Sequence, residues 1–128
     1  MEKLSKLSIL VVEDSNTIRS LIVNTLKKNG VEKITQAIDG KQALDSIAIL
    51  RPDLIISDLV MPRMNGVELL TNLQKNPEFK NTPFVVLTSK TGDATFKKVM
   101  SMGAADYIRK PFGEQELMVK LKSVAEWL

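Results

Sequence analysis

The sequence predicts an α/β fold in which five parallel strands alternate with five helices, and the helices cover both faces of one sheet. Short apolar runs alternate along the chain with segments whose apolar residues recur every three or four positions. The connections between these segments are short, which favours right-handed crossovers between parallel strands. A chain of 128 residues is long enough for one hydrophobic core and not for two. We therefore expect a single domain, residues 1–128.

The first strand is predicted at LSILVVED (7–14), because a continuous apolar run is typical of a strand buried on both faces. A helix should follow, with Ser15 or Asn16 as its N-cap and Gly30 just after its end. The apolar face of this helix is predicted to consist of Ile18, Leu21, Ile22, Thr25 and Leu26.

The same alternation continues to residue 128. Further strands are expected at EKITQA (32–37), PDLIISD (52–58), TPFVVLTS (82–89) and DYIRK (106–110). Further helices are expected at GKQALDSIAIL (40–50), GVELLTNLQK (66–75), DATFKKVMSM (93–102) and from about 114 to 128. The apolar face of the last helix should contain Leu117, Leu121, Val124, Ala125 and Leu128. The polar stretch QKNPEFKNTP (74–83) is predicted to be a surface loop.

The composition excludes several kinds of chemistry. Without cysteine there can be no disulfide, thiolate zinc site or cysteine nucleophile, and without histidine no Ser/His dyad or internal phosphohistidine. The net charge of +3 comes from scattered Lys and Arg, with only four Phe, one Tyr and one Trp, which favours a solvated surface over nucleic-acid binding. No apolar run approaches the length of a membrane span, so we expect a cytoplasmic protein that binds no membrane.

Polar groups follow or end four of the five predicted strands. In an open parallel sheet the functional crevice lies beyond the carboxyl ends of the strands, so these groups should lie at one edge. They are Glu13 and Asp14, then Asp58, then Thr88 and Ser89, then Lys110 and Pro111.

Three carboxylates at one edge repel one another unless a cation lies among them. Oxygen ligands without His or Cys favour Mg²⁺, which leaves room for a phosphate oxygen. Asp14 and Asp58 are the expected direct ligands, and Glu13 should act through water or from an outer shell. Asp58 is then the predicted nucleophile for a phosphoryl group. Lys110 would supply positive charge and Thr88 a hydroxyl donor.

This joint pattern closely resembles the receiver domains of two-component response regulators, most of all the small stand-alone chemotaxis regulators. It consists of the pair Glu13-Asp14, Asp58 in SDLVMPRMNG, the pair Thr88-Ser89, and the KPF segment that begins at Lys110. The resemblance covers essentially the whole chain. It implies a flavodoxin-like (βα)5 fold with strand order 2-1-3-4-5 and a Mg²⁺ cofactor.

The resemblance also implies a role for each residue. Asp58 would be phosphorylated by a CheA-like sensor histidine kinase, and the backbone carbonyl of Val60 would complete a Mg²⁺ shell with the acidic residues. Thr88 and Tyr107 would form the conformational switch, and the Lys110-Pro111 peptide bond should be cis. Taken alone, a strand tyrosine such as Tyr107 is ordinarily half-buried packing, so its switch role rests mostly on the resemblance.

The implied output is a change in the face made by the fourth helix, fifth strand and fifth helix. This face would bind a downstream protein such as the flagellar motor switch or another effector, and a phosphatase is a further expected partner. The protein would be a monomeric regulatory switch that assists only its own phosphorylation and dephosphorylation. The identity of the kinase and the output partner stays open, as does the question of whether the chain is part of a longer protein.

Some positions depart from the commonest family pattern. Glu13 replaces the more frequent Asp, and Val60 and Lys90 occupy two variable positions that tune acyl-phosphate lifetime in this family. One alternative function is an aspartyl-nucleophile phosphohydrolase, but such enzymes usually have a second acid where this chain has Val60. The other is a flavin carrier, which needs a hydroxyl- and glycine-rich phosphate loop where this chain has the acidic segment EDSNTIR (13–19).

Overall fold

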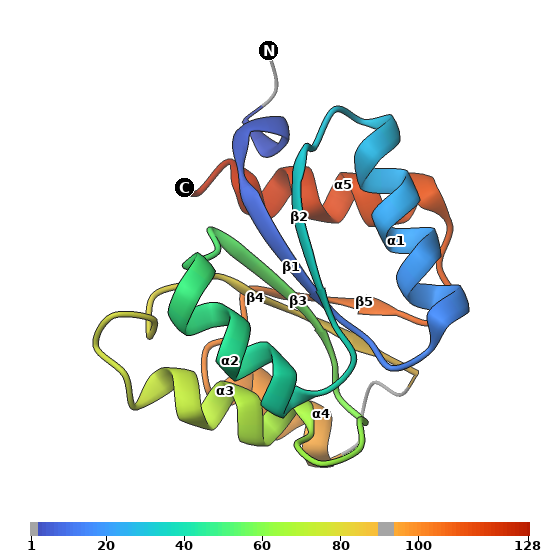
Figure 1. Ribbon diagram of the computed structural model, residues 1–128. Coiled ribbons are helices and arrows are strands. Elements are labelled where there is room, and N and C mark those ends of the chain that lie inside the picture. The colour runs from blue at the N-terminus through green and yellow to red at the C-terminus, as the bar shows by residue number, and fades with distance from the viewer. Residues whose placement is uncertain (1–2, 90–93) are drawn as a thin grey trace.

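The computed structural model describes residues 3–89 and 94–128 and contains one parallel sheet with helices on both faces (Figure 1). The strands are β1 (Ser8–Val12), β2 (Lys33–Ala37), β3 (Leu54–Asp58), β4 (Phe84–Thr88) and β5 (Asp106–Arg109). The helices are α1 (Asn16–Lys28), α2 (Gly40–Leu50), α3 (Gly66–Gln74), α4 (Ala94–Ser101) and α5 (Glu114–Ala125), with a short 3-10 helix η1 (Leu4–Lys6) before β1. The strand order is β2-β1-β3-β4-β5, which confirms the predicted fold class and order.

The sheet separates two hydrophobic clusters. Helices α1 and α5 cover one face, and α2, α3 and α4 cover the other (Figure 1). Successive residues of β1 alternate between them, so that Ile9 and Val11 pack under α1 and α5 while Leu10 and Val12 pack under the other helices. All residues of β3 and β4 are buried, as expected for central strands that are covered on both faces.

The helices that begin at the carboxyl edge of the sheet have local capping signals. The Ser15 hydroxyl accepts a hydrogen bond from the Ile18 N–H, so Ser15 and not Asn16 is the N-cap of α1. Asn65 and Glu68 form a reciprocal capping box at the start of α3. These caps fix where the chain turns after β1 and β3, directly beside the polar strand ends.

Three details of the predicted elements are wrong. Helix α5 ends at Ala125, and Leu128 lies beyond it with 39% of its surface exposed. Leu21 is 37% exposed and lines a surface pocket with Phe112, whereas Val23, absent from the predicted apolar face, is buried. Phe79, in the predicted surface loop, is buried against the cluster under α2, α3 and α4.

The C-terminal end of α5 lies near the amino edge of the sheet. Trp127, the single tryptophan, is 87% exposed and lines a pocket with Pro83 and Ala105, which directly precede β4 and β5. This is the edge opposite the polar strand ends. Within residues 3–89 and 94–128, no helix has both the length and the apolar character needed to span a bilayer.

Candidate functional site

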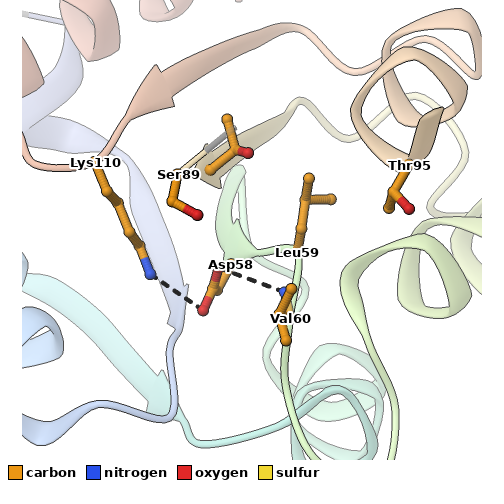
Figure 2. Close-up of a pocket in the computed structure, with 7 residues that line it drawn as sticks. Asp58, Leu59, Val60, Ser89, Thr95 and Lys110 are labelled. Atoms are coloured by element: carbon orange, nitrogen blue, oxygen red, sulfur yellow. Dashed lines mark hydrogen bonds and ion pairs between the residues drawn. The ribbon is translucent and has the colours of Figure 1, made fainter. Parts of the chain in front are cut away.

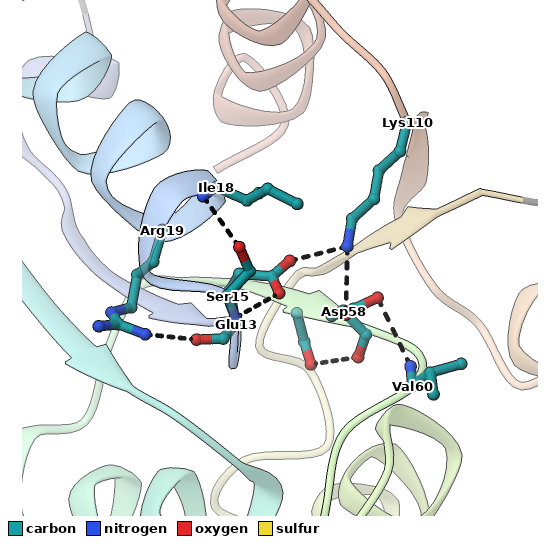
Figure 3. A network of polar contacts seen from close by, with 8 residues as sticks. Glu13, Ser15, Ile18, Arg19, Asp58, Val60 and Lys110 are labelled. Carbon is teal, nitrogen blue, oxygen red and sulfur yellow. Dashed lines mark hydrogen bonds and ion pairs between the residues drawn. The ribbon is translucent and has the colours of Figure 1, made fainter.

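The predicted site residues come together at the carboxyl edge of the sheet. Asp58 ends β3, the strand between β1 and β4, and Thr88 ends β4. Glu13 and Asp14 follow β1 directly, and Lys110 follows β5. Figures 2 and 3 show Lys110 reaching from the end of β5 toward Asp58. The topology thus brings together side chains that are almost one hundred positions apart in the sequence.

The ammonium group of Lys110 lies between two buried carboxylates (Figure 3). Its Nζ is 2.9 Å from Glu13 Oε1 and 3.2 Å from Asp58 Oδ2. Glu13 is 1% exposed and Asp58 7%, so both acids depend on nearby charges and donors in place of water. The other Glu13 oxygen, Oε2, accepts a hydrogen bond from the Ser15 N–H at 3.0 Å.

The pKa values of Glu13 and Lys110 are both raised, and the causes differ for the two groups. Burial raises the pKa of Glu13 above its usual value and the Asp58 charge adds to this, although hydrogen bonds from Lys110 and Ser15 act in the opposite direction. Burial alone would lower the pKa of Lys110, but its hydrogen bond to Glu13 and the charges of both acids raise it above 10.5. Lys110 is therefore a cation at neutral pH, in a site where the negative charge is incompletely neutralised.

The acidic residues also fit a hard cation. Glu13, exposed Asp14 and Asp58 each offer a carboxylate oxygen, and these atoms all lie within 4.8 Å of one another. Oxygen donors without nitrogen or sulfur suit Mg²⁺, and a divalent ion would offset both the burial of Glu13, which is the main cause of its raised pKa, and the smaller repulsion by Asp58. The donor chemistry and the electrostatics therefore agree with the magnesium prediction made from the sequence.

An open pocket of about 390 Å³ gives access to Asp58 (Figure 2). It is lined by Asp58, Leu59, Val60, Thr88, Ser89, Thr95 and Lys110. Val60 is 78% exposed, and its backbone N–H lies 3.5 Å from Asp58 Oδ1. Thr95 was not among the predicted site residues, although a helix that follows β4 must begin at this same edge. Lys90, the second predicted tuning position, lies outside the described residues.

Tyr107 lies outside the group of residues that line this pocket. Its ring is half-buried on β5 and meets the Phe96 ring of α4 edge-on, with 5.1 Å between the centroids. From α5, Lys120 Nζ lies 4.1 Å from the centre of the Tyr107 ring. Tyr107 therefore touches both helices of the face that the resemblance implies for output.

Arg19 makes a polar contact with the site, and the sequence did not predict this contact. One guanidinium nitrogen donates to the backbone carbonyl of Glu13 at 2.8 Å (Figure 3). The Arg19 Nε donates to the Gln36 side chain on β2 at 3.0 Å. The side chain thereby connects α1 to the segment that carries the acidic pair. A lone arginine in the first turns of a helix gives no sequence signal for such a contact.

A second arginine, Arg63, pairs with a buried acid beside the site. Asp39 is 2% exposed and is the N-cap of α2, where its Oδ1 accepts the Gln42 N–H at 2.8 Å. Its Oδ2 lies 2.8 Å from Arg63 Nε and 2.7 Å from Arg63 Nη2. The hydrogen bond from the Gln42 N–H is the main reason that the pKa of Asp39 lies below its usual value of 3.8, and the Arg63 guanidinium lowers this pKa further.

This lowered pKa predicts a pH-dependent stability difference between the wild type and Asp39→Asn. A depressed folded-state pKa means that ionised Asp39 stabilises the fold above pH 3.8, and that this contribution is lost as the pH falls through the folded pKa. The wild type should be more stable than the variant near neutral pH, and the difference should shrink in strong acid. Urea unfolding at about pH 7 and about pH 3 measures this, and an unchanged difference would contradict it.

Comparisons with known proteins agree with this geometry. The response regulator receiver domain model matches residues 9–122. Protein PilG of Pseudomonas aeruginosa is 39% identical over 117 residues, covering 91% of this chain and 86% of PilG. The chemotaxis response regulator CheY4 of Vibrio cholerae has a TM-score of 0.85 at 34% identity, covering 91% of this chain and 97% of that one.

A further solved structure contains a metal ion. The receiver domain of a Pseudomonas aeruginosa sensor histidine kinase, with magnesium coordinated in its active-site cleft, has a TM-score of 0.85 at 27% identity. The match covers 94% of this chain and 98% of that one. Together these similarities confirm the resemblance to chemotaxis-type regulators. The chain belongs to the response regulator receiver domain family of two-component systems.

Proposed function

We propose that the protein is a phosphorylation-activated switch of a chemotaxis-type two-component system, and that Asp58 accepts the phosphoryl group from a CheA-like histidine kinase. The observation that carries this proposal is the position of Asp58. Its carboxylate opens into the pocket, and Lys110 Nζ lies 3.2 Å from Oδ2. A carboxylate that is both accessible and close to a fixed cation is suited to attack a phosphorus atom.

In the proposed transfer, an Asp58 carboxylate oxygen forms a bond to phosphorus as the phosphorus–nitrogen bond to the donor histidine breaks. The released imidazole nitrogen takes up a proton. Lys110 neutralises charge on the phosphoryl oxygens, and the hydroxyl of Thr88, which lines the pocket, donates a hydrogen bond to one of them. Glu13, Asp14, Asp58 and the Val60 carbonyl would bind Mg²⁺, which supplies further charge neutralisation and orients the reacting oxygens.

The proposed output passes from Thr88 through Tyr107 to the face made by α4, β5 and α5. Support comes from the position of the Tyr107 ring, which contacts both Phe96 of α4 and Lys120 of α5. A reoriented ring would change the surface that these helices offer to a downstream protein, such as the flagellar motor switch or an effector.

The remaining proposals follow from this role. Residues 1–128 act as a single receiver domain, monomeric and cytoplasmic, with a phosphatase as a further partner and no direct contact with nucleic acid or membrane. The chain would be a regulatory switch and not an enzyme for external substrates. In support, the exposed side chain in the pocket two residues after Asp58 is Val60, and an alkyl group cannot act as the second acid of a phosphohydrolase.

Acetyl phosphate with Mg²⁺ tests the proposed function. Intact-protein mass spectrometry should find a gain of one phosphoryl group in the wild type and none in Asp58→Asn. Asp53→Asn is the matched control, because Asp53 lies just before the same strand and accepts the Ser8 N–H at the opposite edge of the sheet. It should be labelled like the wild type. Labelling that persists in Asp58→Asn, or a wild type that stays unlabelled, would overturn the assignment.

A further inference from the structure

The loop between β3 and α3, residues 59–65, carries Val60 and is here called the phosphoacceptor loop. The exposed Val60 side chain gives this loop no anchor. Its first residue is fixed by backbone contacts, because the Leu59 N–H donates to Leu87 at 3.3 Å and the Leu59 carbonyl accepts from Gly66 at 2.9 Å. Beyond Val60, Met61 is buried among the residues under α2, α3 and α4.

The far part of the phosphoacceptor loop lies against the start of α2. The Gly40 N–H donates to the Met64 carbonyl at 3.1 Å. A Cβ atom at Gly40 would lie only 2.6 Å from that carbonyl oxygen, so the two backbones approach as closely as glycine allows. The Asp39–Arg63 ion pair stands directly beside this contact and joins the same two segments.

Arg63 also adopts a backbone conformation that needs support from its surroundings. Its φ is 65°, in the left-handed region that residues other than glycine rarely occupy. Arg63 and Arg51 are the two non-glycine residues with positive φ in the described part of the chain. At Arg63 the guanidinium Nε donates a hydrogen bond to the buried Asp39 Oδ2, and Nη2 lies 2.7 Å from the same oxygen, so the ion pair opposes relaxation of the loop.

We propose that Arg63 is a positioning residue, whose ion pair with Asp39 fixes the phosphoacceptor loop so that the Val60 carbonyl faces the Mg²⁺ site. This inference rests on the proposed function. Without Arg63, the buried Asp39 Oδ2 loses its hydrogen-bond donor and its charged partner, and either water enters or the start of α2 moves away from the loop. The Val60 carbonyl then samples several orientations, and the cation loses one oriented ligand.

The test is the Mg²⁺ affinity of the unphosphorylated protein, measured by isothermal titration calorimetry. Arg63→Ala should weaken Mg²⁺ binding about tenfold, as expected when an outer group that orients a metal ligand is removed. Arg51→Ala is the matched control. Arg51 also has positive φ and is paired with Glu78 at 2.8 Å, but it lies at the C-terminal end of α2. This control should keep the wild-type Mg²⁺ affinity.

Two more variants separate positioning from general stability. Arg63→Gly relieves the backbone but removes the ion pair, so it should fold at least as well as Arg63→Ala and still bind Mg²⁺ weakly. Arg63→Lys keeps the charge and should recover part of the affinity. In amide NMR spectra without metal, Val60 should show conformational exchange in Arg63→Gly and not in Arg51→Ala.

The outcomes distinguish this inference from the proposed function. A wild type that binds no Mg²⁺ would refute the proposed function itself. A wild type that binds Mg²⁺, together with Arg63→Ala and Arg63→Gly variants of unchanged affinity, would refute the positioning role alone. Asp39→Asn combined with Arg63→Ala should weaken binding no more than either change alone, because both remove the same pair. Additive losses of Mg²⁺ affinity in the double variant would also count against the positioning role of Arg63.

Discussion

Lys110→Met should lower the free energy of unfolding by about 3 kcal/mol in magnesium-free buffer, because it leaves two buried carboxylates without their cation. Glu13 is the more affected acid, since Lys110 lies 2.9 Å from its Oε1 and burial already raises its pKa. Added Mg²⁺ should raise the Tm of the variant by more than that of the wild type, because the ion takes over the neutralisation that the ammonium provided. Urea unfolding and thermal melts with and without Mg²⁺ measure both effects.

Lys120→Met is the control for this experiment. Lys120 pairs with Asp106 at 3.5 Å, and both side chains are about one-third exposed, at 28% and 32%. A partly exposed pair at this distance contributes less than about 1 kcal/mol, and the contact of Lys120 with the Tyr107 ring adds about 1 kcal/mol at most, so this variant should lose far less stability than Lys110→Met and should gain no more from Mg²⁺ than the wild type. A Lys110→Met protein as stable as Lys120→Met would show that the ammonium does not neutralise the buried acids.

Gly66→Ala should destabilise the protein by about 3 kcal/mol and slow phosphorylation of Asp58, because the new methyl group has no space. A Cβ atom at Gly66 would lie 2.6 Å from the Asp58 carbonyl oxygen and 3.0 Å from Leu59 Cα. These are backbone atoms, which cannot rotate away as a side chain can. Either α3 or the end of β3 must move, and the second movement displaces the phosphoacceptor.

The matched substitution is Gly113→Ala, since Gly113 is the N-cap of α5 and Gly66 is the first residue of α3, and both helices start at the carboxyl edge. A Cβ atom there would meet nothing within 4 Å. Gly113→Ala should lower the free energy of unfolding by less than about 1 kcal/mol, mainly through weaker capping of α5, and should leave labelling by acetyl phosphate unchanged. If Gly66→Ala behaved like Gly113→Ala in chemical unfolding and labelling, the close approach of α3 to β3 would have no energetic importance.

Most of the fold could be predicted because strand and helix periodicity are local properties of this sequence. The buried runs at β3 and β4 and the apolar spacing in α2 and α3 appear without knowledge of neighbours. The strand order came only from the family resemblance, since pairing depends on contacts between distant segments. The exposure of Leu21 and the burial of Phe79 were missed for the same reason, as both depend on tertiary neighbours.

The site was predictable where chemistry is concentrated at strand ends. Asp58, Thr88 and Lys110 could be placed because parallel strands bring their carboxyl ends to one edge. The contacts that support the site could not be predicted, since nothing in the sequence distinguishes Arg19 and Arg63 from ordinary surface arginines. Their importance comes from the Glu13 carbonyl and the buried Asp39 carboxylate, which lie beside them only after folding.

The location of Trp127 determines what intrinsic fluorescence can report. The indole lies at the amino edge beside Pro83 and Ala105, a full strand length of roughly 15 Å from the carboxylates. A bound cation cannot quench its emission by contact at that separation. A change of intensity or wavelength on adding metal or phosphodonor would therefore record a rearrangement that has propagated across the domain, and a constant spectrum would confine the response to the opposite end.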